Sequence, residues 1–223
     1  KIPSVVSFYG YDSSSFPGLL FGYGRAYLQK RVFSNVSAVL AMSPDMKHDL
    51  IKAGCPEEKI IVHYYGTDCK RFDMHRQYPE KGHLNLLILA SLVPQKGHIF
   101  LFKSLLALLQ SGVRNWKLEV IGAGESADQI KNFAQKNGLS EFVRFMGGIP
   151  YGSAEMMEAY RRADIFVHPS VVTENGDKEG IPGTVIEAMA AGLPVVSTYH
   201  AGIPYVISHG KTGLLVQEWD TEE

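Results

Sequence analysis

Short runs of apolar residues alternate along the chain with longer segments in which apolar residues recur at helical spacing. Apolar runs of about four to eight residues are typical of strands that a parallel sheet buries on both faces. Strand–helix alternation in turn indicates a parallel sheet with helices packed against both sides. The predicted strands are residues 4–8, 36–42, 59–63, 84–90, 117–122, 142–146, 164–170 and 194–198. The predicted helices are residues 19–33, 44–53, 97–110, 125–137, 153–162 and 182–191.

Residues 66–83 interrupt this alternation, because they are polar and show neither helical nor strand periodicity. We interpret them as a linker between two α/β units. The first unit has three strands and ends near Phe72, and the second begins near Gly82 and has five strands. We therefore expect an α/β fold, with a Rossmann-like, doubly wound parallel sheet in residues 81–223 and a partial second α/β unit with its linker in residues 1–80.

The predicted helix 182–191 is apolar on nearly every side, which is typical of a buried helix. Glu187 lies in its middle, and a buried ionised carboxylate is costly unless it finds hydrogen bonds. Its neighbours at helical spacing, Gly183, Thr184 and Ala191, are small and leave room for a group that is not protein. The alternative is that Glu187 marks the one solvated stripe of the helix.

The loops that follow the strands are informative, because open α/β sheets bind ligands outside the carboxyl ends of their strands. Lys96 follows the strand at 84–90 and precedes the helix at 97–110. A lysine beside the N–H groups of a helix start suits a phosphate, although a solvated lysine is the simpler alternative. Residues 122–127, GAGESA, match a loose dinucleotide pattern, but the next strand ends in glycines instead of the acidic residue that this pattern requires. A hydride-transfer reaction is therefore disfavoured.

A long polar loop, residues 171–183, leads into the predicted helix 182–191. It carries Glu174, Asp177 and Glu179, which are either ordinary loop charges or metal ligands, although their spacing demands no metal geometry. A third interpretation fits the helix better. The first N–H groups of the helix face an anion, while Glu179 accepts hydrogen bonds from sugar hydroxyls. A nucleotide sugar offers both groups in one ligand.

Composition narrows the possibilities further. The chain has 223 residues, of which 45% are hydrophobic, which favours a folded core over disorder. Its net charge of −1 gives no electrostatic reason to expect nucleic acid as a partner. Cys55 and Cys69 form neither a metal motif nor a disulfide framework, which favours a reducing compartment. No apolar run approaches the ~20 residues of a membrane span. Because the chain begins without Met in a strand-like segment, we expect it to be a fragment.

The segment EGIPGTVIEAMAAGLPVVSTYHAGIPYVISHGKTGLLV, residues 179–216, resembles the signature region of the retaining GT-B glycosyltransferases of family 4. The E-x7-E motif of that family matches Glu179 and Glu187. SLVPQKG, VIGAGE, FMGGIP and DIFVHPS are similar to further family segments and follow in the same order. Because AMSPDMKHDLIKAGCPEEKIIVHYYGTDCKRF resembles the end of the family's N-terminal domain and its linker, the resemblance covers nearly the whole chain.

The resemblance implies a hexosyltransferase that moves a sugar from a nucleotide-diphosphate sugar to a glycan or lipid-linked acceptor with retention, in bacterial polysaccharide biosynthesis. It implies a cytoplasmic protein, with possible peripheral contact at the inner face of the membrane, and neither a metal nor another cofactor. The catalytic roles fall on Glu179, which would hold hydroxyls of the donor sugar, and on Lys96, which would neutralise the diphosphate. Glu187 would bind the ribose. The other implied donor-binding residues are Ile181, Pro182, Gly183 and Thr184 at the sugar and phosphates, and Gly147, Gly148 and Ile149 near the nucleobase.

Three positions depart from the family pattern. Ser91 stands where the family usually has an arginine, Tyr205 where it often has a glutamate, and Tyr9 where it often has a histidine near the reacting sugar. A nucleotide-sugar-binding module without transfer activity therefore stays an alternative. The amphipathic, basic segment 19–33 is compatible with a bilayer surface, but such a segment more often packs on its own sheet.

Overall fold

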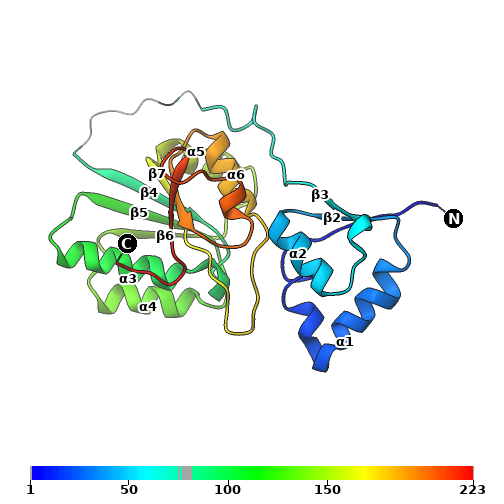
Figure 1. Cartoon of the computed structure of the whole chain (residues 1–223). Helices are drawn as coiled ribbons and strands as arrows, with labels where there is room; N and C mark the ends of the chain where they lie inside the picture. Colours follow the sequence, from blue (N-terminus) through cyan, green and yellow to red (C-terminus); the bar gives the residue numbers. More distant parts are fainter. Residues whose placement is uncertain (1, 75, 77–81, 223) are drawn as a thin grey trace.

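The computed structural model describes residues 2–74, 76 and 82–222. Its strands form two parallel sheets (Figure 1). The first sheet has the order β1-β2-β3 and the second the order β6-β5-β4-β7-β8-β9. The strands of the first sheet are β1 (Val5–Ser7), β2 (Ala38–Ala41) and β3 (Ile60–Val62). Those of the second are β4 (Leu84–Leu89), β5 (Trp116–Ile121), β6 (Val143–Gly147), β7 (Ile165–His168), β8 (Val195–Thr198) and β9 (Gly213–Val216). The predicted α/β class and parallel sheets are confirmed.

The helices begin and end close to the residues that the hydrophobic pattern indicates. Their bounds are α1 (Leu19–Tyr27), α2 (Pro44–Lys52), α3 (His98–Gln110), α4 (Ala127–Lys136), α5 (Ala154–Arg162) and α6 (Gly183–Ala190). The sequence explains these limits: Ser43 and Ser153 cap α2 and α5 by accepting the N–H groups of Met46 and Met156. In the second sheet, α3 and α4 share one hydrophobic cluster, and α5 and α6 share another, so helices cover both faces.

The structure differs from the sequence prediction at one strand and one helix. The sequence predicted five strands in the second sheet, and the structure adds β9 at the edge, where β8 is its neighbouring strand. Its apolar run is short and only Leu215 is fully buried, because an edge strand has one neighbour. The predicted helix 19–33 is also broken: Leu20 and Phe21 have positive φ values of 49° and 57°, and the segment after α1 continues as a π-helical turn, Leu28–Phe33.

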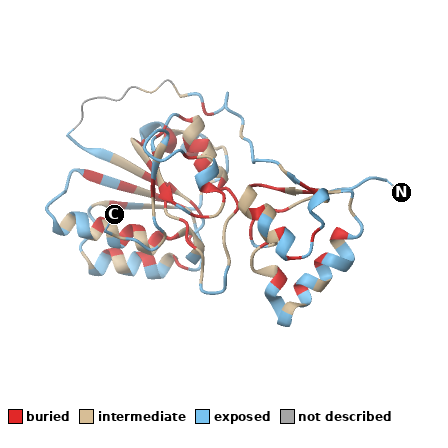
Figure 2. Cartoon of the chain, in the orientation of Figure 1, coloured by how far each residue is buried: buried red, intermediate tan, exposed pale blue. Residues whose placement is uncertain are grey.

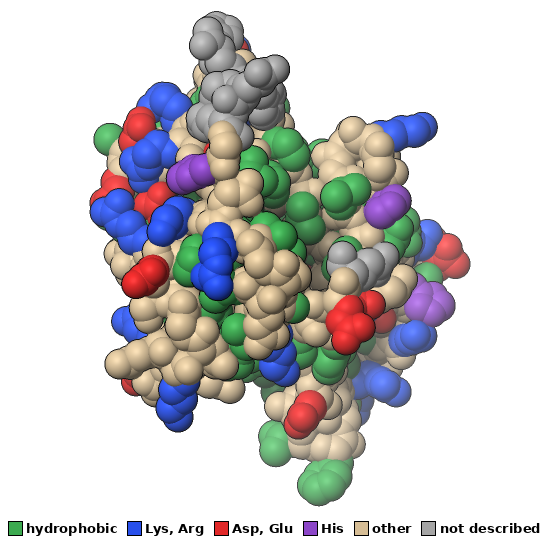
Figure 3. Space-filling model, turned by 90° about the vertical axis from the view of Figure 1, so that its left-hand side faces the viewer, with side chains coloured by type: hydrophobic (Ala, Val, Ile, Leu, Met, Phe, Trp, Pro, Cys, Tyr) green, Lys and Arg blue, Asp and Glu red, His purple; other side chains and the backbone are tan. Residues whose placement is uncertain are grey.

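This broken segment packs on its sheet at one end only. Leu28 and Phe33 are buried in the cluster of the first unit, as the packing interpretation expects. Leu20, Phe21 and Tyr23 are exposed. Hydrophobic side chains accordingly project at the lower tip of the molecule in Figure 3, the end at which Figure 1 draws α1. Among the described residues, no helix combines the length and the apolar character that crossing a bilayer requires.

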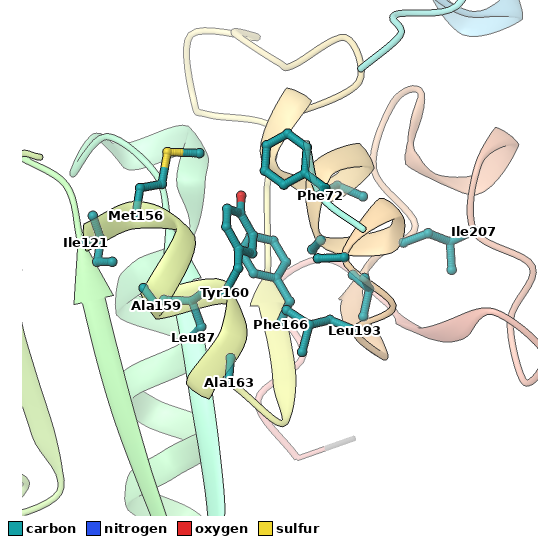
Figure 4. Packing of buried hydrophobic residues seen from close by; sticks show 14 of the residues in the cluster. Phe72, Leu87, Ile121, Met156, Ala159, Tyr160, Ala163, Phe166, Leu193 and Ile207 are labelled. Atoms are coloured by element: carbon teal, nitrogen blue, oxygen red, sulfur yellow. The ribbon is translucent and has the colours of Figure 1, made fainter. Parts of the chain in front are cut away.

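Phe72 connects the predicted linker to the second unit. Its side chain is 0% exposed and packs edge-on against Tyr160 of α5, with ring centroids 5.6 Å apart (Figure 4). The chain before the undescribed residues is therefore attached to the α5–α6 face of the second sheet. The predicted boundary between residues 80 and 81 lies outside the described residues.

The order of the second sheet places one crevice at β4. The chain runs outward through β5 and β6 and then returns to the other side of β4 as β7, so the connections diverge at the carboxyl ends of β4 and β7. Such a switch point opens a crevice in which ligands bind. Buried residues concentrate along the strands and the inner helix faces, which makes this edge a rigid support for its loops (Figure 2).

Candidate functional site

Lys96 and Glu179 meet at this crevice. The Lys96 Nζ lies 2.8 Å from the Glu179 Oε1, and each side chain is 16% exposed. Lys96 ends a short 3₁₀ turn, Pro94–Lys96, and Gly97 follows with a φ of 68°. A Cβ at Gly97 would lie 1.8 Å from the carbonyl oxygen of Pro169, so only glycine allows this close approach. The structure thus pairs the residue predicted to bind phosphate with the residue predicted to hold the sugar.

The N-terminus of α6 follows Glu179 directly. Pro182 is the N-cap residue and offers no side-chain hydrogen bond to the first turn, where Gly183 lies close to the ring of Tyr65. The first N–H groups of a helix carry a partial positive charge, which favours an anion. Ile181 has a different environment, since it is buried in the hydrophobic cluster of the first unit. The structure thus places Ile181 between the two units.

Glu187 is buried, with 3% exposure, but it has a protein partner that the sequence did not indicate. The hydroxyl of Tyr160 donates to its Oε2 at 2.9 Å. Burial, together with the Glu187 carboxylate, raises the pKa of Tyr160, so this phenol stays protonated and donates. The solvated-stripe alternative for Glu187 is therefore wrong, and Tyr160 occupies one oxygen of its carboxylate. Contact with a ribose stays a prediction.

The loop after β6 reaches the same carboxylate. Gly147 ends β6 and accepts the N–H of Gly122 at 2.8 Å, and Ile149 packs against the α5–α6 cluster. Tyr151 follows, and partial burial and then the Glu187 carboxylate raise the pKa of its phenol. Gly147, Gly148 and Ile149 thus belong to the same loop as Tyr151, and Tyr151 lies near Glu187 of α6. Tyr151 was not among the sequence predictions, because nothing in the sequence placed it beside Glu187.

The loop before α6 also contacts the first unit (Figure 1). Lys178 lies 2.6 Å from both Asp45 and Asp49 of α2, and these two carboxylates raise its pKa despite its partial burial. A Cβ at Gly180 would lie 2.8 Å from the carbonyl oxygen of Tyr9, just after β1. The loop that carries Glu179 is therefore clamped between the two units. Tyr9 takes part in this contact through its backbone.

Glu174 and Asp177 do not join Lys96. Glu174 is exposed, and Asp177 accepts a hydrogen bond from Ser14 Oγ at 3.3 Å. Burial is the main reason why the pKa of Asp177 is raised. Within the part of the chain that the structure describes, no three acidic, histidine or cysteine side chains are grouped so as to hold a metal ion.

Two buried histidines lie near Lys96. His98 begins α3 and His168 ends β7, and their ring nitrogens have no hydrogen-bond partner among the described residues. Burial, and then the nearby Lys96 charge, lowers the pKa of His98 to about 4, and the same two causes hold the pKa of His168 well below its usual value. Both rings are therefore neutral at pH 7 and add no charge beside Lys96.

The folded protein should consequently lose stability in mild acid. Between pH 6.5 and 4 the unfolded chain protonates His98 and the folded chain does not, so the free energy of unfolding falls as pH falls, by about 1.4 kcal/mol per pH unit for one such histidine. His98→Leu removes this contribution. We expect urea unfolding at pH 6.5, 5.5 and 5.0 to give a shallower pH dependence for the variant than for the wild-type chain. Equal slopes would contradict the burial of a neutral His98.

Comparisons with known proteins identify the family of the chain. The profile of the family described as glycosyl transferases group 1 matches residues 83–223. The chain is similar to the amylovoran biosynthesis glycosyltransferase AmsK of Erwinia amylovora, with 35% identity over 192 residues, which are 86% of this chain and 46% of AmsK. It is also similar to a protein named as a colanic acid biosynthesis glycosyltransferase, WcaL, of Escherichia coli (strain K12), with 34% identity over 99% of this chain and 52% of WcaL. The chain spans about half the length of these relatives.

Solved structures support the fold. Anabaena Alr3699/HepE in complex with UDP-glucose superposes with a TM-score of 0.81 and 20% identity, over 99% of this chain and 60% of that one. The apo form of the lipopolysaccharide outer core galactosyltransferase WaaB gives a TM-score of 0.68 at 20% identity, over 94% of this chain and 54% of that one. Both superpositions support the α/β fold described above.

Proposed function

Because the chain belongs to the glycosyl transferases group 1 family, we propose that it is the donor-binding part of a glycosyltransferase. The enzyme would transfer a hexose from a nucleotide-diphosphate sugar to a glycan or lipid-linked acceptor, with retention of configuration at the anomeric carbon. The name of AmsK, which refers to amylovoran biosynthesis, supports bacterial polysaccharide biosynthesis as the setting. The complex of HepE with UDP-glucose supports a nucleotide sugar as the donor.

One observation carries this proposal: Lys96, Glu179 and the start of α6 lie together at the switch point of the second sheet. A nucleotide sugar needs a cation for its diphosphate and acceptors for its hydroxyls, and this site has both. Glu187 lies one turn further along α6, where it would bind the ribose of the same donor. These positions support a nucleotide sugar as the donor.

The chemistry follows from these charges. When the bond between the anomeric carbon and the diphosphate breaks, negative charge develops on the leaving phosphate. Lys96 and the first N–H groups of α6 would stabilise that charge, so the proposal requires no metal. Glu179 accepts hydrogen bonds and orients the sugar. We assign no protein nucleophile.

A lipid-linked acceptor would also imply contact between the protein and the membrane. A lipid-linked acceptor would bring the protein to the inner face of the cytoplasmic membrane as a peripheral protein. The exposed Leu20, Phe21 and Tyr23, with Arg25 nearby, give α1 an apolar and basic tip that supports this contact. Weaker sedimentation with anionic vesicles after Phe21→Ser would be the simplest sign of it.

Calorimetry tests the donor proposal directly. The chain is titrated with UDP-glucose, GDP-mannose and ADP-glucose, and then assayed for donor hydrolysis and for transfer to a defined glycan acceptor. We expect one base to bind more tightly than the others, and turnover with that donor in the full-length protein. Tight binding without turnover there would favour a binding module without transfer activity. Binding of none of the three would contradict the proposed function.

Glu187→Ala is expected to weaken nucleotide binding by ~1–3 kcal/mol, the range for lost hydrogen bonds to a charged group. Calorimetry with the preferred nucleoside diphosphate measures this change. Tyr160→Phe is the matched control, because it removes the hydrogen bond at Oε2 and keeps the carboxylate. The control should lose less affinity than Glu187→Ala. Unchanged affinity in a folded Glu187→Ala chain would count against contact with the ribose.

A further inference from the structure

We propose that His200 and Glu218 position Glu179 for the donor sugar through a hydrogen-bonded relay. This inference rests on the proposed function, since it assumes that Glu179 holds the sugar. Neither residue touches the Glu179 carboxylate in the described contacts, so both act through the backbone and are positioning residues. Sequence analysis assigned no role to either of them.

The relay starts at the backbone of Glu179. Its N–H donates to the Nε2 of His200 at 3.0 Å, and the Nδ1 of His200 lies 2.8 Å from the Oε1 of Glu218. A backbone N–H can only donate, so Nε2 is the acceptor and the ring proton of the neutral imidazole sits on Nδ1. His200 therefore donates to Glu218. The imidazole is 0% exposed, which keeps water from competing for either contact.

Glu218 connects the relay to the other end of the same loop. Its Oε2 accepts the N–H of Val172 at 2.7 Å and the indole N–H of Trp219 at 3.1 Å. Burial alone would raise the pKa of Glu218, but the hydrogen bonds from His200 and Val172 hold that pKa below its usual value. The Glu218 carboxylate, just after β9, thus restrains the loop at two places. It binds the loop directly at Val172, and it binds Glu179 through His200.

This restraint matters because it acts on the backbone of Glu179 itself, whereas Lys178 and Gly180 on either side contact the first unit. Earlier in the loop the chain reaches solvent. Residues 174–176 are exposed, and Gly176 has a φ of 77°. Without the relay, the N–H of Glu179 would lose its acceptor. The Glu179 peptide could then rotate while the contacts of Lys178 and Gly180 kept the fold intact. The Glu179 side chain would then leave its place beside Lys96, and a displacement of about 1 Å at a reacting group can cost about 100-fold in rate.

Four variants separate positioning from a merely structural role. His200→Leu fills the space but removes both hydrogen bonds, and Glu218→Ala removes the other end of the relay. His200→Gln keeps an amide oxygen that can accept from Glu179 and an N–H group that can donate to Glu218. His209→Leu is the matched control, because His209 likewise accepts a backbone N–H, but from Leu215 in β9.

Calorimetry on the 223-residue chain compares UDP with UDP-glucose and GDP with GDP-mannose. The readout is the ratio of the two Kd values within each pair, which isolates the contribution of the sugar. We expect His200→Leu and Glu218→Ala to raise the Kd of the nucleotide sugar about tenfold relative to that of the nucleotide, and to change the nucleotide Kd less than twofold. His200→Gln should restore most of the wild-type ratio, and His209→Leu should not change it.

The possible failures are distinguishable. A wild-type chain that binds none of UDP-glucose, GDP-mannose and ADP-glucose overturns the proposed function and this inference together. Wild-type binding with an unchanged ratio in Glu218→Ala and His200→Leu overturns the relay alone, as does an equal loss of affinity for nucleotide and nucleotide sugar. If thermal melting shows that His200→Leu does not fold, Glu218→Ala and His200→Gln decide the question by the same ratio.

Discussion

Lys96→Ala is expected to weaken binding of the preferred nucleoside diphosphate about 10- to 100-fold, which is the range for losing a charge-assisted hydrogen bond. The loss has two physical sources. The variant removes the cation that would pair with the phosphates, and it leaves the Glu179 carboxylate, now without its partner at 2.8 Å, beside an anionic ligand. Both effects act in the same direction, and both grow in a crevice where each side chain is only 16% exposed.

Lys103→Ala is the matched control for this experiment. Lys103 lies on α3, the helix that follows Lys96, and its Nζ is exposed above the ring of Phe100 at 5.4 Å. The control should leave the Kd unchanged, since the charge is removed away from the crevice. Adding Glu179→Gln to Lys96→Ala should recover part of the affinity, because the repulsive carboxylate becomes neutral. An unchanged Kd in folded Lys96→Ala would rule out the phosphate role of Lys96.

The largest expected effect on stability belongs to Phe72→Ala. Phe72 is 0% exposed and packs on Tyr160 in the α5–α6 cluster, so truncation should lower the free energy of unfolding by about 3–5 kcal/mol. The cost combines lost burial with the cavity that forms beside Tyr160. Denaturation in urea, followed by tryptophan fluorescence and circular dichroism, measures the change.

Phe21→Ala is the control for that loss. Phe21 is a phenylalanine on α1 whose side chain is fully exposed, so its truncation should change the free energy of unfolding by less than about 0.5 kcal/mol. If Phe72→Ala were as mild as Phe21→Ala, Phe72 would not be part of the core of the second unit. The chain before the undescribed residues would then be a free linker, as the sequence predicts for residues 66–83.

The local pattern was sufficient for most elements. All eight predicted strands are present, as β1 to β8, and the predicted helices other than 19–33 lie within a few residues of their observed bounds. These elements have continuous apolar runs or clear helical spacing, and both are properties of consecutive residues. β9 was missed because an edge strand buries few side chains. The prediction of one helix at 19–33 was wrong because the hydrophobic pattern is continuous there, whereas the backbone leaves the helical conformation near its start.

The candidate site divides in a similar way. Lys96 and Glu179 could be selected from the sequence, because each is a charge in a loop between the carboxyl end of a strand and an apolar helix. Glu187 could be selected because it is a carboxylate in the middle of an apolar helix. Their partners could not be selected. Tyr160, His200 and Glu218 lie on other elements, and no spacing along the chain connects them to the residues that they contact.

The amino-acid sequence by itself determined the α/β class, the order of the elements and the charged residues available at the crevice, since these depend on periodicity and on side-chain chemistry. Only the tertiary structure decided which of those charges meet. It pairs Lys96 with Glu179 and brings the hydroxyl of Tyr160 to the Glu187 carboxylate. It also buries Phe72, from the predicted linker, in the α5–α6 cluster of the second unit. The physical reason is that hydrogen bonds and packing form between residues far apart in the chain, and only the arrangement of the strands in the sheet brings them within reach.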